Sequence, residues 1–388
     1  MNKFVVVYAD GPASPLTDPL TLADVADVDG PVSVQLGFTV HAPSWLADNS
    51  IDCRTFMAGY GLASAVRNGR VLVEPLRLSQ IPSFLTARPP EVAVVTGVAR
   101  GCGWAFTTSV GWGDMAAVKA RNVIVEVDPD GVDFGGPDIV GNIVGTVERP
   151  RLSVDSVVSR SADETDLRIG ALVASLVPVD ATLQFGPGGV GEGIARALTR
   201  PVRIWSGLFT DAMADLALRG LVIDKPVAAY TWGGEPIDRL GRAGGIDLRP
   251  VSVTHDAYRL GAISRFVACN TALQVGLDGA INVEQVGGRV ITSVGGHTDF
   301  CEGAAQSVGG ISVIAVRSMT AKGASTIVVT PEVVSTPGNL VSVVVTEHGI
   351  ADLRGMTVDE RAQAIVAVAD PSVRAQLRTG YFSLRHPA

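Results

Sequence analysis

The most informative segment of this chain is Val179-Asp180-Ala181-Thr182-Leu183-Gln184-Phe185-Gly186-Pro187-Gly188-Gly189-Val190-Gly191. An apolar run ends in a glycine-rich turn and helix-like residues 189–198 follow, which predicts a strand, a tight turn and a helix. In open α/β sheets, ligands bind beyond the carboxyl ends of such strands, because glycine lets the backbone approach a ligand and a helix N-terminus favours anions. The spacing does not match the P-loop of nucleotide-binding proteins. Taken alone, the segment is explained at least as well by a glycine turn that serves only helix–strand packing.

The same alternation of strands and helices extends through most of the chain. Short runs rich in Val and Ile recur between Gly, Pro and Asp residues, and helix-like segments separate many of them. These runs cover residues 32–37, 71–73, 92–95, 123–127, 181–185, 222–230, 311–316, 326–330 and 340–345. Because they lack a clean alternation of polar and apolar residues, they are typical of strands buried on both faces. We therefore expect βαβ units and a mainly parallel sheet.

Two segments far apart in the chain resemble each other. Residues 29–37 and residues 179–186 each form a predicted strand that contains a glutamine, ends in glycine and precedes a helix. This similarity favours a duplicated α/β half, and chance similarity of such short strings is the alternative. The charged, Ser-rich stretch 154–166 carries no long apolar run, which favours a domain boundary near residue 160. We expect an amino-terminal α/β domain at 1–160 and a carboxy-terminal α/β domain at 161–388.

Composition and charge exclude several classes of protein. The 388 residues are 47% hydrophobic and 18% charged, with a mean hydropathy of +0.31, which excludes a disordered chain. The net charge is −8 and no dense basic run occurs, so nucleic acid is not an expected partner. The chain has no signal-like start and no stretch of about 18 apolar residues, so we expect a cytoplasmic protein without a membrane partner. The four cysteines form no CxxC pair, so we expect neither disulfides nor a metal site.

Two further motifs carry side chains that are capable of chemistry. Gly295-Gly296-His297-Thr298-Asp299-Phe300 combines a paired glycine turn with a histidine and an aspartate that can cap a helix. Thr346-Glu347-His348-Gly349-Ile350-Ala351-Asp352-Leu353-Arg354-Gly355 places a Glu-His pair directly after a predicted buried strand. Each motif also has a purely structural interpretation, with Asp299 as a plain N-cap, His297 as a surface residue and the Glu-His pair as a loop anchor.

Together these segments resemble the acetyl-CoA hydrolase/transferase family, which includes 4-hydroxybutyrate, butyrate and succinate:acetate CoA-transferases. The similarity lies in residues 270–289, in the two motifs above, and in residues 73–82 and 122–127 of the first half. It implies two related open-sheet α/β domains of the CoA-transferase type, with the active site and acyl-CoA in the cleft between them. Coenzyme A would enter as the acyl-CoA substrate, without a metal. The resemblance also implies a homo-oligomer, most often a homodimer.

The sequence departs from that family at the nucleophile. Family transferases use a glutamate that attacks the thioester and becomes a glutamyl-CoA intermediate. The matching stretch here is Trp205-Ser206-Gly207-Leu208-Phe209-Thr210-Asp211, with Gly207 at the glutamate position and Trp205 where histidine is usual. Pro187 lies near the position whose backbone N–H binds the thioester oxygen, and proline has no N–H. His297 stands where glutamine is frequent. Four changes at one expected cleft favour altered chemistry over simple loss of function.

These observations give specific site predictions. Glu347 is predicted as the general base and His297 as the second acid–base group, because both motifs border the family's active site. The residues expected around the CoA thioester arm are Gly188, Gly189, Asn270, Gly295 and Gly296. The predicted function is hydrolysis, or another altered reaction, of an acyl-CoA.

Two alternatives stay open. In the first, the chain is a conventional CoA-transferase that uses Glu192, Glu235 or Glu284 as its nucleophile. In the second, it is a non-catalytic CoA-binding subunit.

Overall fold

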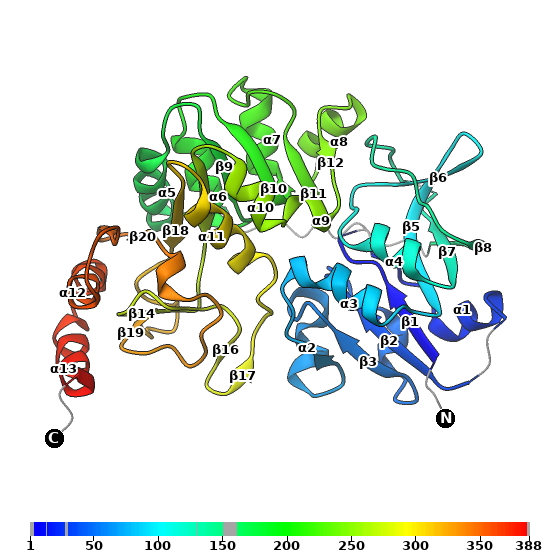
Figure 1. Ribbon diagram of the computed structural model, residues 1–388, viewed down its shortest axis with the longest axis horizontal. Helices are drawn as coiled ribbons and strands as arrows, with labels where there is room; N and C mark the ends of the chain where they lie inside the picture. Colours follow the sequence, from blue (N-terminus) through cyan, green and yellow to red (C-terminus); the bar gives the residue numbers. More distant parts are fainter. Residues whose placement is uncertain (1–3, 13, 28–29, 130, 150–160, 386–388) are drawn as a thin grey trace.

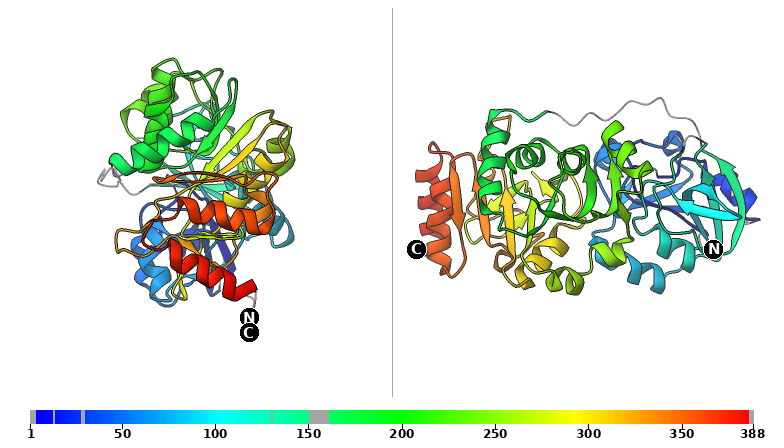
Figure 2. Two further views of the ribbon diagram at one scale, coloured as in Figure 1. Left: turned by 90° about the vertical axis from the view of Figure 1, so that its left-hand side faces the viewer. Right: turned by 90° about the horizontal axis from the view of Figure 1, so that it is seen from above.

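The computed structural model describes residues 4–12, 14–27, 30–129, 131–149 and 161–385. The described part contains two eight-stranded sheets that lie side by side along the long axis of the molecule, one in each half of the chain (Figure 1). Helices α12 (Val358–Val368) and α13 (Arg374–Arg385) lie at the far end of the second half, away from the first sheet (Figures 1 and 2). The predicted α/β fold with two open sheets is confirmed.

The first sheet has the strand order β4-β3-β2-β1-β5-β7-β8, with β6 beside β5. Its pairs are parallel except β5 with β6. The strands are β1 (Phe4–Tyr8), β2 (Val32–Leu36), β3 (Asp52–Thr55), β4 (Leu72–Val73), β5 (Val92–Arg100), β6 (Gly103–Phe106), β7 (Asn122–Val127) and β8 (Ile143–Glu148). The α-helices are α1 (Pro19–Val25), α2 (Ala63–Arg67), α3 (Ile81–Ala87) and α4 (Gly113–Lys119).

The second sheet has the strand order β12-β11-β10-β9-β13-β18-β20-β21, and only β20 with β21 is antiparallel among these pairs. Its strands are β9 (Thr182–Phe185), β10 (Arg203–Thr210), β11 (Val227–Trp232), β12 (Asp247–Leu248), β13 (Phe266–Asn270), β18 (Ile311–Ala315), β20 (Val343–Thr346) and β21 (Gly349–Asp352). The helices are α5 (Glu164–Leu176), α6 (Gly189–Ala197), α7 (Asp211–Leu218), α8 (Glu235–Arg242), α9 (Val251–Thr254), α10 (Ala257–Ala262) and α11 (His297–Gln306). The chain between β13 and β20 also forms two small sheets. One contains β14 (Gln274–Gly276), β15 (Ile281–Asn282) and β19 (Ile327–Val328), and the other contains β16 (Gln285–Val286) and β17 (Arg289–Val290).

The second sheet is covered on both faces, as the short apolar runs predict. In β13, Val267 and Cys269 pack into the large core that includes residues of α5, α6 and α7. Phe266 and Ala268 point the other way, into a cluster with Leu260 of α10 and residues of α11. A side chain on β13 therefore faces either the α5–α7 layer or the α10–α11 layer.

The two sheets repeat the same strand order. Reading each from its edge, β4-β3-β2-β1-β5-β7-β8 corresponds to β12-β11-β10-β9-β13-β18-β20. The segment comparison that suggested this duplication was wrong in its pairing, because β2 corresponds by position to β10 and β9 corresponds to β1. A short apolar strand that ends in glycine identifies a buried strand before a turn, but it does not specify the strand's place in the sheet. The expected boundary near residue 160 falls outside the described residues.

The two halves make direct contacts. Val110 N donates to Ala229 O at 3.0 Å and Val251 N donates to Gly111 O at 2.8 Å. Between the halves, the phenol of Tyr230 donates to the carboxylate of Asp10 at 2.5 Å. Asp10 is only 3% exposed, and burial raises its pKa to about 7.

Candidate active site

The carboxyl ends of five neighbouring strands meet at one edge of the second sheet. Strands β10, β9, β13, β18 and β20 are adjacent and mutually parallel. The segments that follow them therefore lie at the same edge, which is where ligands bind in open α/β sheets. They carry most of the predicted site residues, including the glycine turn after β9, Asn270 at the end of β13 and Glu347 after β20.

The glycine turn after β9 divides into an open part and a packed part. Gly188 has φ +103°, a conformation that favours glycine, and no atom lies within 4 Å of the position that a Cβ would take. A Cβ on Gly189, in contrast, would lie 2.0 Å from Oδ2 of Asp166. Asp166 is buried on α5 and accepts a hydrogen bond from Nε of Arg317 at 3.0 Å. Gly188 is therefore accessible to a ligand, whereas Gly189 makes room for the carboxylate of Asp166.

Asn270 belongs to a polar cluster at the ends of β9 and β13. Its Oδ1 accepts from Nε2 of Gln184 at 3.4 Å, and its Nδ2 lies 3.8 Å from Sγ of Cys301. Gln184 is 4% exposed, and its Oε1 has no hydrogen-bond partner in the described part of the chain. A buried acceptor without a donor is uncommon, and this one lies on β9 directly before the glycine turn. Burial raises the pKa of Cys301 to about 11 and keeps it a neutral thiol.

His297 is the first residue of α11, and both of its ring nitrogens are engaged. Nε2 lies 3.1 Å from the carbonyl oxygen of Thr271 and Nδ1 lies 2.9 Å from Oγ1 of Thr336. A carbonyl only accepts, so Nε2 carries the proton and Nδ1 is an acceptor within reach of the Thr336 hydroxyl and, at 3.8 Å, of the Cys301 thiol. Burial lowers the pKa of His297 to about 4. The ring is therefore neutral near pH 7, and neither nitrogen is free to move a substrate proton.

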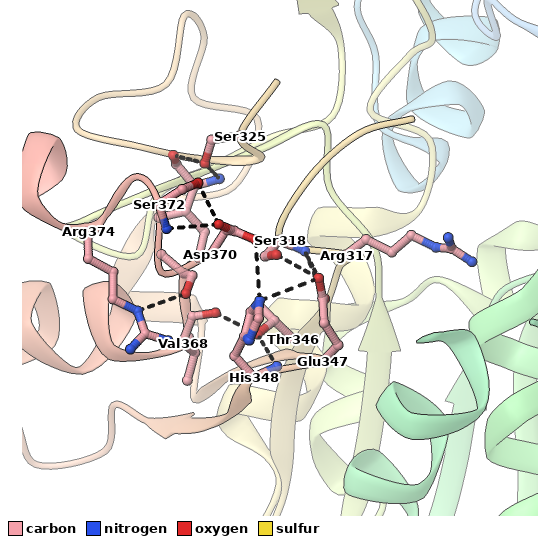
Figure 3. A network of polar contacts seen from close by, with 12 residues as sticks. Arg317, Ser318, Ser325, Thr346, Glu347, His348, Val368, Asp370, Ser372 and Arg374 are labelled. Carbon is pink, nitrogen blue, oxygen red and sulfur yellow. Dashed lines mark hydrogen bonds and ion pairs between the residues drawn. The ribbon is translucent and has the colours of Figure 1, made fainter. Parts of the chain in front are cut away.

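Glu347 follows β20 and holds the segment after β18 (Figure 3). Its Oε2 accepts from Ser318 N at 2.9 Å and its Oε1 accepts from Ser318 Oγ at 2.6 Å. His348 lies beside it, with Nε2 at 3.8 Å from Oε1 of Glu347 and 3.6 Å from Oδ2 of Asp370. These hydrogen bonds anchor the loop that contains Ser318. Because the Glu347 side chain is 21% exposed, a small molecule can also reach it.

The glycine pair at 295–296 contacts the first half of the chain. Gly295 has φ +55°, and its carbonyl oxygen accepts from Leu78 N at 3.0 Å. Nearby, Asp299 accepts from Ser79 N at 3.2 Å and from Ser79 Oγ at 2.7 Å. Burial raises the pKa of Asp299 to about 6. Asp299 therefore joins the two halves of the chain.

Gly207 lies in β10 on the face toward α10 and α11, and a histidine ring fills the space beside it. A Cβ at position 207 would lie 2.9 Å from Nε2 of His255 and 3.4 Å from the ring of Phe300. His255 is 1% exposed, and burial lowers its pKa to about 3. His255 carries no functional signal in the sequence, because Thr254-His255-Asp256 before a helix looks like an ordinary capping segment.

The three alternative glutamates have other partners or lie elsewhere. Glu192 in α6 accepts from Ala162 N at 2.7 Å and pairs with Arg196. Glu235 is exposed at the start of α8. Glu284 lies between β15 and β16 and accepts from Ser335 Oγ at 2.7 Å. None of these three lies at the carboxyl end of one of the five central strands.

Neither a metal centre nor a membrane span is indicated by the described residues. Within the ranges given above, no group of three or more His, Cys, Asp or Glu side chains could hold a metal ion. No helix in that part of the chain combines the length and apolar character needed to cross a bilayer.

Comparison with known proteins relates this chain to CoA-transferases and acetyl-CoA hydrolases. Residues 237–381 match the acetyl-CoA hydrolase/transferase C-terminal domain. The chain is 28% identical to 4-hydroxybutyrate coenzyme A transferase of Clostridium kluyveri, over 81% of this chain and 78% of that one. Crystal structures of RipA from Yersinia pestis (25% identity, TM-score 0.85) and of 4-hydroxybutyrate CoA-transferase from Porphyromonas gingivalis (24%, TM-score 0.75) each match 99% of this chain and 94% of their own.

The chain is therefore an enzyme with the fold of the CoA-transferases. The resemblance to the acetyl-CoA hydrolase/transferase family is confirmed, because residues 237–381 match the C-terminal domain of that family, as the motifs after β13 and β20 predicted.

Proposed function

We propose that this enzyme hydrolyses an acyl-CoA and does not transfer CoA through a glutamate of its own. The observation that carries the proposal is Gly207, a buried strand residue without a side chain, beside which the His255 ring fills the available space. The family resemblance puts the transferase nucleophile at this position. Without a carboxylate there, neither an anhydride nor a glutamyl-CoA can form.

Water then takes the place of the carboxylate as acceptor. The water oxygen attacks the thioester carbonyl carbon, the C–S bond breaks, and the sulfur leaves as CoA thiol after taking up a proton. The second proton of the water is released to solvent, and the products are CoA and a carboxylate. Of the two predicted acid–base groups, Glu347 suits the role of base better, because its side chain is 21% exposed and each carboxylate oxygen can accept a second hydrogen bond, whereas neither nitrogen of His297 is free.

Three features support acyl-CoA binding at the carboxyl edge of the second sheet. The space beside Gly188 is open, and Gly188 directly precedes the N-terminus of α6. The buried Oε1 of Gln184 has no donor among the described residues, and it would gain one if the side chain turned toward an amide N–H group of the CoA arm. Asn270 lies next to Gln184. We propose Gly188, Gly295 and Asn270 as contacts of the thioester arm, whereas Gly189 and Gly296 act by making room for Asp166 and His255.

The test is turnover by the purified chain with a panel of acyl-CoAs. Hydrolysis predicts release of free thiol without any added carboxylate, and one ¹⁸O atom from labelled water in the acid product. Trapping with hydroxylamine or borohydride should leave every glutamate unmodified. A glutamyl-CoA adduct on Glu192, Glu235 or Glu284 would establish a conventional transferase, and absence of turnover with all substrates would favour a non-catalytic CoA-binding subunit. From the sequence we also propose that the protein is cytoplasmic and forms a homo-oligomer. Sedimentation of the purified chain tests the oligomeric state.

A further inference from the structure

We propose that His255 determines which nucleophile this site can use, because its imidazole occupies the volume that a side chain at position 207 would need. The inference rests on the proposed function and deepens it. On this inference, the site lacks a nucleophile because of two residues together, Gly207 on β10 and His255 after α9. Position 207 and position 255 would then form a matched pair, in which histidine at position 255 requires glycine at position 207.

The geometry of the ring supports this pairing. The imidazole lies in a slot between two glycines, since a Cβ on Gly207 would lie 2.9 Å from Nε2 and a Cβ on Gly296 would lie 2.5 Å from the same atom. The ring of Phe300 closes the slot, with its centroid 4.7 Å from that of His255. Both distances from a Cβ to Nε2 are shorter than van der Waals contact. A side chain at position 207 or at position 296 would therefore have to displace the ring of His255.

The ring is also held in place and cannot simply move aside. Nδ1 lies 2.9 Å from Oγ1 of Thr254, and that hydroxyl donates to the carbonyl oxygen of Pro250 at 3.2 Å. On β10, Trp205 lies two residues before Gly207 and thus on the same face. Its indole Nε1 donates to the carbonyl oxygen of Thr254 at 3.0 Å, directly before His255. The two departures on β10 therefore act on one neighbour, because Trp205 anchors the backbone of the histidine that Gly207 admits.

The hydrogen bonds also assign the tautomer of His255. If the Thr254 hydroxyl donates to Pro250, it can only accept from the ring, so Nδ1 carries the proton and Nε2 has a free lone pair. The opposite tautomer would need the Thr254 hydroxyl to donate to Nδ1 and to give up its hydrogen bond to Pro250. The site therefore presents a neutral acceptor beside position 207, where a transferase would present an anionic carboxylate.

The experiment compares Gly207→Glu, His255→Ala and the double variant G207E/H255A with the unmodified protein. Each is incubated with acetyl-CoA, trapped with borohydride or hydroxylamine, and analysed by peptide mass spectrometry. We expect no adduct in either single variant. We expect an adduct on the introduced glutamate only in the double variant, together with CoA transfer to added carboxylates. Gly103→Ala is the control for replacing a strand glycine, because the nearest atom to its Cβ position is 4.0 Å away.

Two results would overturn the inference. One is a G207E variant that is as heat-stable as the unmodified protein and forms the adduct with His255 still present. The other is a folded double variant that binds CoA by calorimetry and forms no adduct.

If the unmodified protein neither binds nor turns over any acyl-CoA, the proposed function fails and a stability cycle still decides the pairing. Gly207→Ala should then raise the unfolding equilibrium constant at least about tenfold, and His255→Ala should largely remove that effect. Equal effects of Gly207→Ala with and without His255 would overturn the pairing.

Discussion

Asp10 should make the stability of this protein fall as the pH rises from about 4 to about 7. Its carboxylate is 3% exposed at the junction of the two halves and accepts hydrogen bonds from the phenol of Tyr230 at 2.5 Å and from Trp112 N at 3.2 Å. Burial raises its pKa from 3.8 to about 7, despite both hydrogen bonds. The folded state therefore disfavours the ionised form more strongly than the unfolded chain does.

The sign and size of the effect follow from linkage. Because the folded pKa lies above the unfolded one, Asp10 contributes its full stability below about pH 4, and this contribution is lost as the pH rises through about 7. A difference of about three pKa units corresponds to roughly 4 kcal/mol, at about 1.4 kcal/mol per unit. Asp10→Asn removes the titration and keeps an acceptor for Tyr230, so its free energy of unfolding should lack this part of the pH dependence.

Urea unfolding of the native protein and of D10N at pH values from 4.5 to 8 measures this difference. Other buried carboxylates titrate in both proteins, so the informative quantity is the difference between the two curves, which should change by several kcal/mol in favour of D10N. Asp24→Asn on the exposed face of α1 is the matched control and should run parallel to the native protein. Parallel curves for the native protein and D10N would refute the reasoning.

Two further predictions concern the candidate site. Gly189→Ala should destabilise the protein by about 1–3 kcal/mol in urea unfolding, because its Cβ would lie 2.0 Å from the buried carboxylate of Asp166. Gly186→Ala is the control. No atom lies within 4 Å of its Cβ position, so it should change the free energy of unfolding by less than about 0.5 kcal/mol. Glu347→Gln should lower kcat for hydrolysis about 100-fold or more if the carboxylate is the general base. Ser318→Ala, which removes only a donor to that carboxylate, should keep most of the activity, and an equal loss in both variants would show that Glu347 acts only by holding the loop.

Local features of the chain were sufficient to predict the fold class and the family. Val- and Ile-rich runs that are buried on both faces, separated by helices, predict a parallel sheet whatever its strand order, because burial and backbone hydrogen bonding act on each segment by itself. Glycines at strand ends and the motif after β20 predict a site at one edge of the second sheet. The family resemblance likewise puts Gly207 at the expected nucleophile position from the sequence alone, because matching a motif needs no tertiary contacts.

Only the tertiary structure decided what each of those residues does. Gly188 and Gly189 are neighbours in the sequence, yet one faces open space and the other faces Asp166, because the packing of α5 against α6 sets the difference. His297 keeps neither nitrogen free, and His255 fills the space beside Gly207 from a different element, 48 positions along the chain. The physical reason is that secondary structure depends on near neighbours in the sequence, whereas side-chain volume, burial and proton affinity depend on which distant segments meet.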